Sequence, residues 1–143
     1  MRKFRFIAIV FLASFSFPAC DELNDLLSDD PRDAFVGDWS VKEENTLKST
    51  DYYNVTIRKS ESDTSLVIIE NFYQLSYSTE VEAKVTGSNI TIASQTVSAA
   101  GSDFKIQGYG SMPFNGKTIG WSYTVDYLND YVDQVTATFT RED

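Results

Sequence analysis

The side chains that could do chemistry in this chain are acidic and aromatic, because histidine is absent. Its 143 residues include 21 Asp and Glu, eight Tyr, two Trp and one Cys. Without an imidazole there is no Ser-His or Cys-His nucleophile pair, and the commonest metal ligand is missing. No two carboxylates stand out by their spacing as the acid and base of a hydrolase. The composition therefore predicts a protein that is not an enzyme and that needs no metal or cofactor.

Large aromatic side chains are the candidates for binding a ligand. Four of them fall on the apolar sides of alternating segments: Trp121, Tyr123, Phe104 and Phe139. These rings either fill the core of a small fold or line a cavity that holds an apolar or planar ligand. Six tyrosines near expected strand ends could add a rim that binds a sugar or a protein: Tyr52, Tyr53, Tyr73, Tyr77, Tyr127 and Tyr131.

Two further motifs favour structural interpretations. Asp126, Asn129, Asp130 and Asp133 offer oxygen ligands for calcium, but the glycine and final glutamate of an EF-hand loop are missing. A solvated polar loop is therefore expected there. Gly108-Tyr109-Gly110 lacks the third glycine and the following helix of a phosphate-binding loop, and indicates relief of crowding where a strand bends.

Length and charge narrow the class of protein. A chain of 143 residues fits one domain, and an apolar share of 42% is enough for a core. The formal net charge of −9 argues against nucleic-acid binding, which depends on basic surface to neutralise phosphate.

The elements that must position these side chains are strands. From Phe35 onward, apolar and polar residues alternate in seven short segments, the period of a half-buried strand: 35–42, 54–58, 80–85, 89–92, 104–107, 119–126 and 134–140. An eighth strand is expected at 66–69, a short apolar run whose facing the pattern alone does not show. Turn residues separate them, and Asn115-Gly116 is the strongest signal for a type I′ hairpin. Short connections imply antiparallel neighbours. The sequence predicts an all-β fold, either an eight-stranded antiparallel up-and-down barrel or a β-sandwich.

The start of the chain has the pattern of a secretory signal. Arg2, Lys3 and Arg5 precede an apolar stretch over 6–17, which is shorter than the roughly 20 residues that span a bilayer. We expect this stretch to be removed from the mature protein.

The residues that close this signal, Phe17-Pro18-Ala19-Cys20, resemble the lipobox of bacterial lipoproteins. The resemblance implies cleavage before Cys20 and attachment of lipid there, so that the protein is anchored to a membrane without spanning it. Otherwise the segment is an ordinary secretion signal with a stray cysteine. We expect a signal peptide over 1–19, the lipidated cysteine with an acidic tether over 20–33, and one barrel domain over 34–143.

The first expected strand carries a second resemblance. Gly37-Asp38-Trp39 resembles the Gly-x-Trp signature of lipocalins and other calycin barrels. In that family the Trp closes one end of the barrel and an Arg of the last strand packs across it. The resemblance implies that Gly37, Trp39 and Arg141 close the barrel here.

More broadly, residues 35–141 resemble small calycin-like barrel lipoproteins of Bacteroidetes-type bacteria. The acidic residues after Cys20 are similar to the signal that sends some of those proteins to the cell surface. We therefore expect a non-catalytic lipoprotein of the outer membrane, on its periplasmic or its surface face, that binds a small apolar or glycan ligand at the barrel mouth or rim. The alternative is a filled barrel that docks on, or inhibits, another envelope protein.

Overall fold

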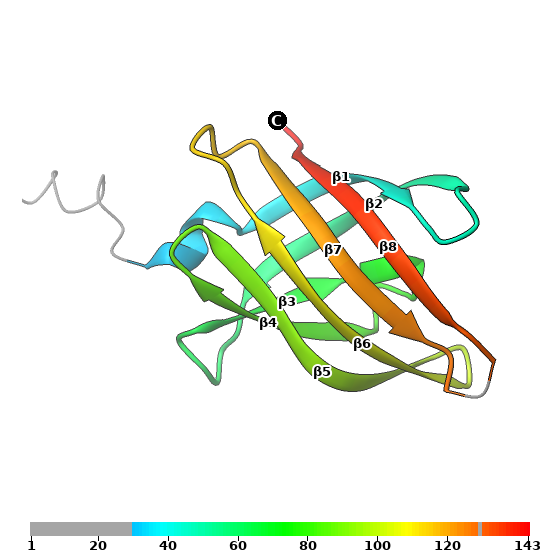
Figure 1. Cartoon of the computed structure of the whole chain (residues 1–143). Coiled ribbons are helices and arrows are strands. Elements are labelled where there is room, and N and C mark those ends of the chain that lie inside the picture. Colours follow the sequence, from blue (N-terminus) through cyan, green and yellow to red (C-terminus); the bar gives the residue numbers. More distant parts are fainter. Residues whose placement is uncertain (1–29, 129) are drawn as a thin grey trace, which may run out of the picture.

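The chain folds into eight antiparallel strands, which close into a barrel (Figure 1). The computed structural model describes residues 30–128 and 130–143. The elements in chain order are η1 (Pro31–Ala34), β1 (Gly37–Glu44), β2 (Thr50–Lys59), β3 (Leu66–Glu70), η2 (Phe72–Gln74), β4 (Glu80–Thr86), β5 (Asn89–Ala99), β6 (Ser102–Ser111), β7 (Thr118–Asp126) and β8 (Val132–Arg141). Each strand pairs with the next along the chain. The up-and-down barrel that the sequence predicts is confirmed, and the sandwich is excluded.

The barrel closes where the first strand, β1, pairs with the last, β8. The ladder runs from Trp39 opposite Arg141 to Glu44 opposite Thr136, and Figure 1 shows the two strands side by side. This pairing removes the free edges that the first and last strands of an open sheet would present. The register also defines two ends of the molecule. We call the end at Trp39 the tryptophan end and the end at Glu43 the glutamate end.

Apolar side chains fill the interior of the barrel. Along β1, Trp39, Val41 and Glu43 are buried while Ser40 and Lys42 are exposed. The largest fully buried side chains are Trp39, Phe35, Phe72, Phe139, Ile57, Ile69, Ile90, Ile92, Ile106 and Ile119. Eight strands make an interior that side chains of this size can fill, so most of the rings predicted to be inside form a packed core.

Two glycines of β6 make room for two rings of β7. Gly108 lies opposite Tyr123, and Gly110 lies opposite Trp121. A Cβ atom on Gly108 would lie 2.4 Å from the Tyr123 Cβ, and one on Gly110 would lie 2.8 Å from the Trp121 Cδ2. The glycines therefore let β7 bring both aromatic residues close to β6.

The connection between β6 and β7 differs from the expected hairpin. A type I′ turn needs positive φ at both central residues, but Gly116 has a φ of 66° and Asn115 is not among the residues with positive φ. The Gly116 N–H donates to the Pro113 carbonyl over 3.1 Å, so the turn spans four residues. The sequence predicts the place of this hairpin correctly and its turn type wrongly.

Residues 31–33, assigned to the tether from the sequence, form η1 and pack on the barrel. Arg32 is 7% exposed and pairs with Asp30 over 2.7 Å. Its guanidinium also donates to three backbone carbonyls in and beside the turn between β2 and β3. This part of the expected tether therefore belongs to the folded domain.

The expected signal peptide and the lipid attachment site at Cys20 lie outside the described residues. Within the described part of the chain, no helix is long and apolar enough to cross a bilayer.

Candidate functional site

The three residues predicted to close the barrel lie together at the tryptophan end. The Arg141 guanidinium stacks on the Trp39 indole, with its Cζ 4.3 Å from the ring centroid, and donates to the Val36 carbonyl over 2.9 Å. Gly37 has a φ of 135°, and a Cβ there would lie 3.0 Å from Arg141 Nη1. The Trp39 Nε1–H donates to the Phe35 carbonyl over 2.9 Å. These paired groups close the barrel interior at this end, so a site inside the barrel would have to open at the glutamate end.

A side chain from a connection plugs the glutamate end. η2, between β3 and β4, turns Phe72 into the barrel, where it is fully buried. The Phe72 ring centroid lies 4.6 Å from that of Tyr123, 5.9 Å from that of Trp121 and 6.4 Å from that of Phe139. Three of the four candidate ligand-binding residues therefore surround a ring that the chain itself supplies.

The backbone that carries this plug is in an unfavourable conformation. Asn71, Tyr73 and Gln74 have φ values of 62°, 54° and 56°, a region that residues other than glycine rarely occupy. The Asn71 side-chain amide donates to the Asn54 carbonyl over 2.8 Å and ties the connection to β2. Non-glycine residues prefer negative φ, so the local sequence does not favour this conformation. The Asn71 hydrogen bond and the burial of Phe72 help to hold the connection in place.

One buried donor within the aromatic group lacks a partner. The Trp121 Nε1–H donates to no acceptor among the described residues, although the Trp121 side chain is buried. A buried donor left in this state costs about 1–3 kcal/mol of stability. A ligand that brought a hydrogen-bond acceptor to this position would remove the penalty.

A buried carboxyl group lies beside the same rings. Glu43 is 2% exposed, and its Oε2 accepts hydrogen bonds from Tyr53, over 2.5 Å, and from Tyr123. Burial raises the pKa of Glu43 above its ordinary value, because the two tyrosine hydrogen bonds offset only part of the desolvation. Burial likewise raises the pKa of Tyr53 and of Tyr123, so both stay protonated as donors.

A second carboxylate, Asp133, completes the polar part of this end. It accepts from the Tyr73 hydroxyl over 2.5 Å and from the Thr46 N–H over 2.9 Å, and Tyr73 in turn bonds to Tyr127 over 2.8 Å. Burial alone would raise the pKa of Asp133, but these hydrogen bonds outweigh it and lower the pKa. The expected solvated loop therefore does not include Asp133, which is buried.

Two other features of that loop bear on the calcium alternative. Asn129, one of its four proposed oxygen ligands, lies outside the described residues. Within 30–128 and 130–143, no group of three or more Cys, Asp or Glu side chains is placed to hold a metal ion.

The remaining aromatic candidates lie at the rim. Phe104 is half-buried and packs edge-on against Tyr127, with ring centroids 5.2 Å apart, so it is not among the rings around Phe72. The Tyr131 ring stacks on the Tyr127 ring, with their centroids 4.6 Å apart. Of the six rim tyrosines, Tyr53, Tyr73 and Tyr127 are half-buried in the site, while Tyr52, Tyr77 and Tyr131 are exposed.

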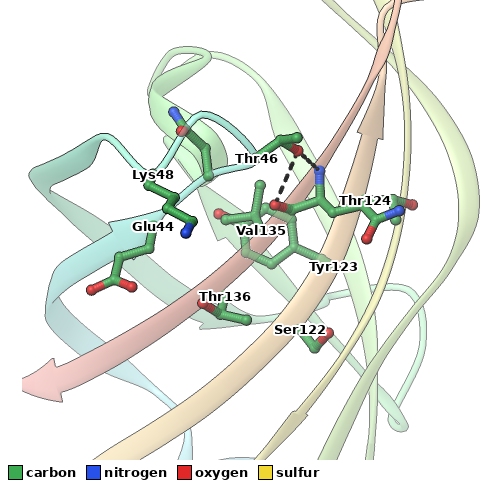
Figure 2. Close-up of a pocket in the computed structure, with 10 residues that line it drawn as sticks. Glu44, Thr46, Lys48, Ser122, Tyr123, Thr124, Val135 and Thr136 are labelled. Carbon is green, nitrogen blue, oxygen red and sulfur yellow. Dashed lines mark hydrogen bonds between the residues drawn. The ribbon is translucent and has the colours of Figure 1, made fainter.

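A separate polar groove of about 450 Å³ lies between the β1–β2 hairpin and strands β7 and β8 (Figure 2). The residues that line it include Thr46, Ser122, Thr124 and Thr136. Thr46 is already engaged, because its hydroxyl accepts from the Gln134 N–H over 2.8 Å. The only ring in the lining, Tyr123, is buried, so this groove offers no exposed aromatic face for a sugar.

Sequence reasoning missed Phe72 and Glu43. Glu43 continues the inward series of Gly37, Trp39 and Val41, so the period of two already placed it inside, although a charged residue is rarely buried. No comparable signal exists for Phe72. It follows a residue with positive φ in a connection without any periodicity.

Comparisons with known proteins address the fold. No family model and no curated protein matches the chain. A redesigned beta barrel, b11L5F_LGL, is 10% identical with a TM-score of 0.55, covering 80% of this chain and 96% of that chain. EF1p2_mFAP2b bound to DFHBI is 13% identical with a TM-score of 0.54, covering 79% and 98% respectively. These similarities show the fold alone, and the fold is consistent with a calycin-like barrel.

Proposed function

We propose that this chain is a lipid-anchored, non-catalytic protein of the cell envelope that binds a small ligand inside the glutamate end of its barrel. The ligand is planar and largely apolar, and it takes the place of Phe72. The lipobox-like residues that end at Cys20 support membrane attachment. The resemblance to Bacteroidetes-type barrel lipoproteins supports the outer membrane as the location.

The unpartnered Trp121 Nε1–H is the observation that carries the ligand proposal. Every other buried side-chain nitrogen or oxygen of the described residues has a hydrogen-bond partner. The exception lies beside Phe72, a ring that could be exchanged for another planar group. A bound acceptor would satisfy the donor, and apolar parts of the ligand would replace the contacts that Phe72 makes.

Displacement of Phe72 leaves the barrel wall intact. Phe72 belongs to a connection and not to a strand, so its withdrawal breaks no hydrogen bond of the sheet. The positive φ values of Asn71, Tyr73 and Gln74 lower the cost of changing the backbone there. The fold also tolerates a guest, since EF1p2_mFAP2b is bound to DFHBI.

The competing function is a filled barrel that docks on another envelope protein. It is supported by the packed interior, in which Phe72 and Trp39 are fully buried. The two functions differ in one respect that can be measured. Only the first requires a saturable site that opens when Phe72 is removed.

Nile red is a suitable probe, because it is planar, neutral and carries a carbonyl acceptor. In the Cys20→Ala background, which has no lipid of its own, we expect Phe72→Ala to bind one equivalent of dye at least ten times more tightly than the parent. Trp121→Phe, added to Phe72→Ala, should weaken binding about three- to tenfold, the effect of one hydrogen bond. Fluorescence titration measures both changes.

Phe114→Ala is the matched control, because Phe114 is fully exposed at the opposite end and should not affect dye binding. Circular dichroism checks that each variant is folded. If Phe72→Ala does not fold, Phe72→Leu takes its place in the titration. The ligand proposal fails if no folded variant shows saturable binding. It also fails if Trp121→Phe leaves the affinity unchanged.

Membrane attachment is tested by Cys20→Ala in the producing cell. We expect the unchanged chain in the membrane fraction, extracted only by detergent, and the variant in the soluble fraction. Mass spectrometry of the unchanged chain should show cleavage before Cys20 and added acyl groups. Membrane association of the variant at the level of the unchanged chain would contradict the anchor.

A further inference from the structure

We infer that the tryptophan end of the barrel docks on the bilayer surface and that Phe114 enters the lipid. This inference rests on the anchor at Cys20 that the proposed function includes, but it concerns a different surface from the ligand site. The partner is the polar–apolar boundary of a bilayer composed mainly of zwitterionic lipid.

An apolar groove at the tryptophan end carries the inference. It measures about 530 Å³, and its walls include Pro31, Ala34, Met112, Pro113 and Phe114. The Phe114 side chain is fully exposed, the most exposed of the large apolar side chains in the described residues. A phenylalanine beside an open apolar groove forms a continuous patch, which a single exposed apolar residue would not.

The turn between β6 and β7 holds Phe114 outward. Pro113 fixes one backbone dihedral before it, and the Gly116 N–H donates to the Pro113 carbonyl over 3.1 Å. The Lys117 N–H donates to the Asn115 side chain over 2.9 Å. The ring is therefore presented by an ordered turn, and its burial in lipid would order little additional backbone.

The position of the chain before Asp30 identifies the bilayer as the occupant. Pro31 lines the groove, and Cys20 lies ten residues before Asp30, a distance of about 35 Å at most when fully extended. A strand of ten residues, such as β8, is about 33 Å long, and the tilt of about 35–45° usual for barrel strands makes it span about 25 Å along the barrel axis. Contact through the glutamate end would therefore use most of the tether, whereas contact through the tryptophan end uses little of it.

The charges at this end fit a zwitterionic surface. Arg32 pairs with Asp30, and Lys59 pairs with Asp30 over 3.1 Å and with Asp33, so the charges of Asp30 and Asp33 are balanced by two cations. Glu61, Glu142 and Asp143 are exposed at the same end and would be repelled by anionic lipid. Phe114 can enter an uncharged interface without carrying a carboxylate with it.

A fluorescent probe at position 114 tests the docking. Cys20 is the only cysteine of the chain, and lipidation consumes its thiol, so Phe114→Cys in the lipidated protein adds the only reactive thiol. The NBD-labelled variant is reconstituted in phosphatidylcholine–phosphatidylethanolamine vesicles. We expect NBD emission to shift to the blue and to rise severalfold, and spin-labelled lipid to quench it.

Leu47→Cys is the matched control, since Leu47 is exposed on the β1–β2 hairpin at the glutamate end. Its NBD label should behave as in water. Water-like emission from both labels, in protein that mass spectrometry shows to be lipidated, overturns the docking inference and leaves the anchor standing. Protein without acyl groups overturns both.

A second copy of the chain is the other possible cover for the patch. The Cys20→Ala, Phe114→Cys double variant has no anchor and is labelled without vesicles. We expect its NBD label to be water-like at all protein concentrations. An emission shift that grows with protein concentration would identify self-association and overturn docking on lipid.

Discussion

Glu43 places an ionisable group where solvent cannot reach it. Its buried carboxyl accepts from Tyr53 and Tyr123, and burial raises its pKa in the folded protein above the ordinary value of 4.5. Between pH 4.5 and the raised pKa, the folded chain therefore holds a proton that the unfolded chain has lost. Glu43 favours the folded state most at low pH, and this contribution declines as the pH rises through that window.

Replacement of Glu43 should make stability less dependent on pH. We expect the melting temperature of the unchanged protein to fall as the pH is raised above about 4.5, and Glu43→Gln to reduce this slope, because the amide does not titrate. Glu44→Gln is the matched control, since Glu44 is the next residue and is exposed. Equal slopes for Glu43→Gln and the unchanged protein would contradict the assignment.

Asp133 acts in the opposite direction, below the range of that test. Its pKa is lowered, so its contribution to stability is present above pH 3.8 and is lost as the pH falls further. Measurements for Glu43 therefore belong above pH 4.5, where Asp133 is ionised in both states.

At the scale of elements, the pairing of β6 with β7 depends on the absence of two side chains. Gly108 and Gly110 face Tyr123 and Trp121 across the ladder, and neither glycine has a positive φ. These glycines therefore serve to let β6 and β7 approach closely, and not to allow a backbone conformation that other residues avoid. The aromatic group around Phe72 depends on this approach.

Gly108→Ala should destabilise the barrel by about 1–3 kcal/mol, because its methyl group would overlap the Tyr123 Cβ at 2.4 Å. Gly120→Ala on β7 is the control. A Cβ at Gly120 meets no atom within 4 Å, so this variant should change the free energy of unfolding by less than about 0.5 kcal/mol. Urea titrations measure both values, and similar values would contradict the steric argument.

The strands could be predicted from sequence, but the connections that shape the site could not. Alternation of apolar and polar residues locates seven of the eight strands, because one face of each faces the interior. The eighth, β3, is found as a short apolar run, and its three central residues are all buried. The conformation of Asn71 to Gln74 depends on tertiary contacts that oppose local preference. The place of Phe72 in the interior follows from that conformation, so the pattern of the sequence contains no sign of it.

At the scale of the whole molecule, the pairing of β1 with β8 closes the eight strands into one barrel. Trp39 on β1 contacts Arg141 on β8 and donates to the Phe35 carbonyl before β1. The Gly-x-Trp motif and the final arginine could be identified from sequence. Their contact is expected from the calycin resemblance and not from their spacing, because only closure of the barrel brings two such distant residues together.

Trp39→Ala should therefore destabilise the entire barrel by about 3–5 kcal/mol, the usual effect of removing a large buried ring. In the Trp39→Ala variant, circular dichroism and the fluorescence of the remaining Trp121 should report the same urea midpoint. By either measurement, this midpoint should be lower than that of the unchanged protein. Tyr52→Ala removes an exposed aromatic ring from β2 and should cost less than about 1 kcal/mol. A near-neutral Trp39→Ala would mean that the Gly-x-Trp match has no structural role.

The seam between β1 and β8 also sets the order of events during synthesis. Trp39 pairs with Arg141, about a hundred residues later, so a chain that emerges from its N-terminus cannot complete the barrel until Arg141 is out. Until then β1 lacks one of its two neighbours, and pairing over so long a separation is slow. The barrel therefore acquires its closed, stable form only after the whole of β8 is free to pair with β1.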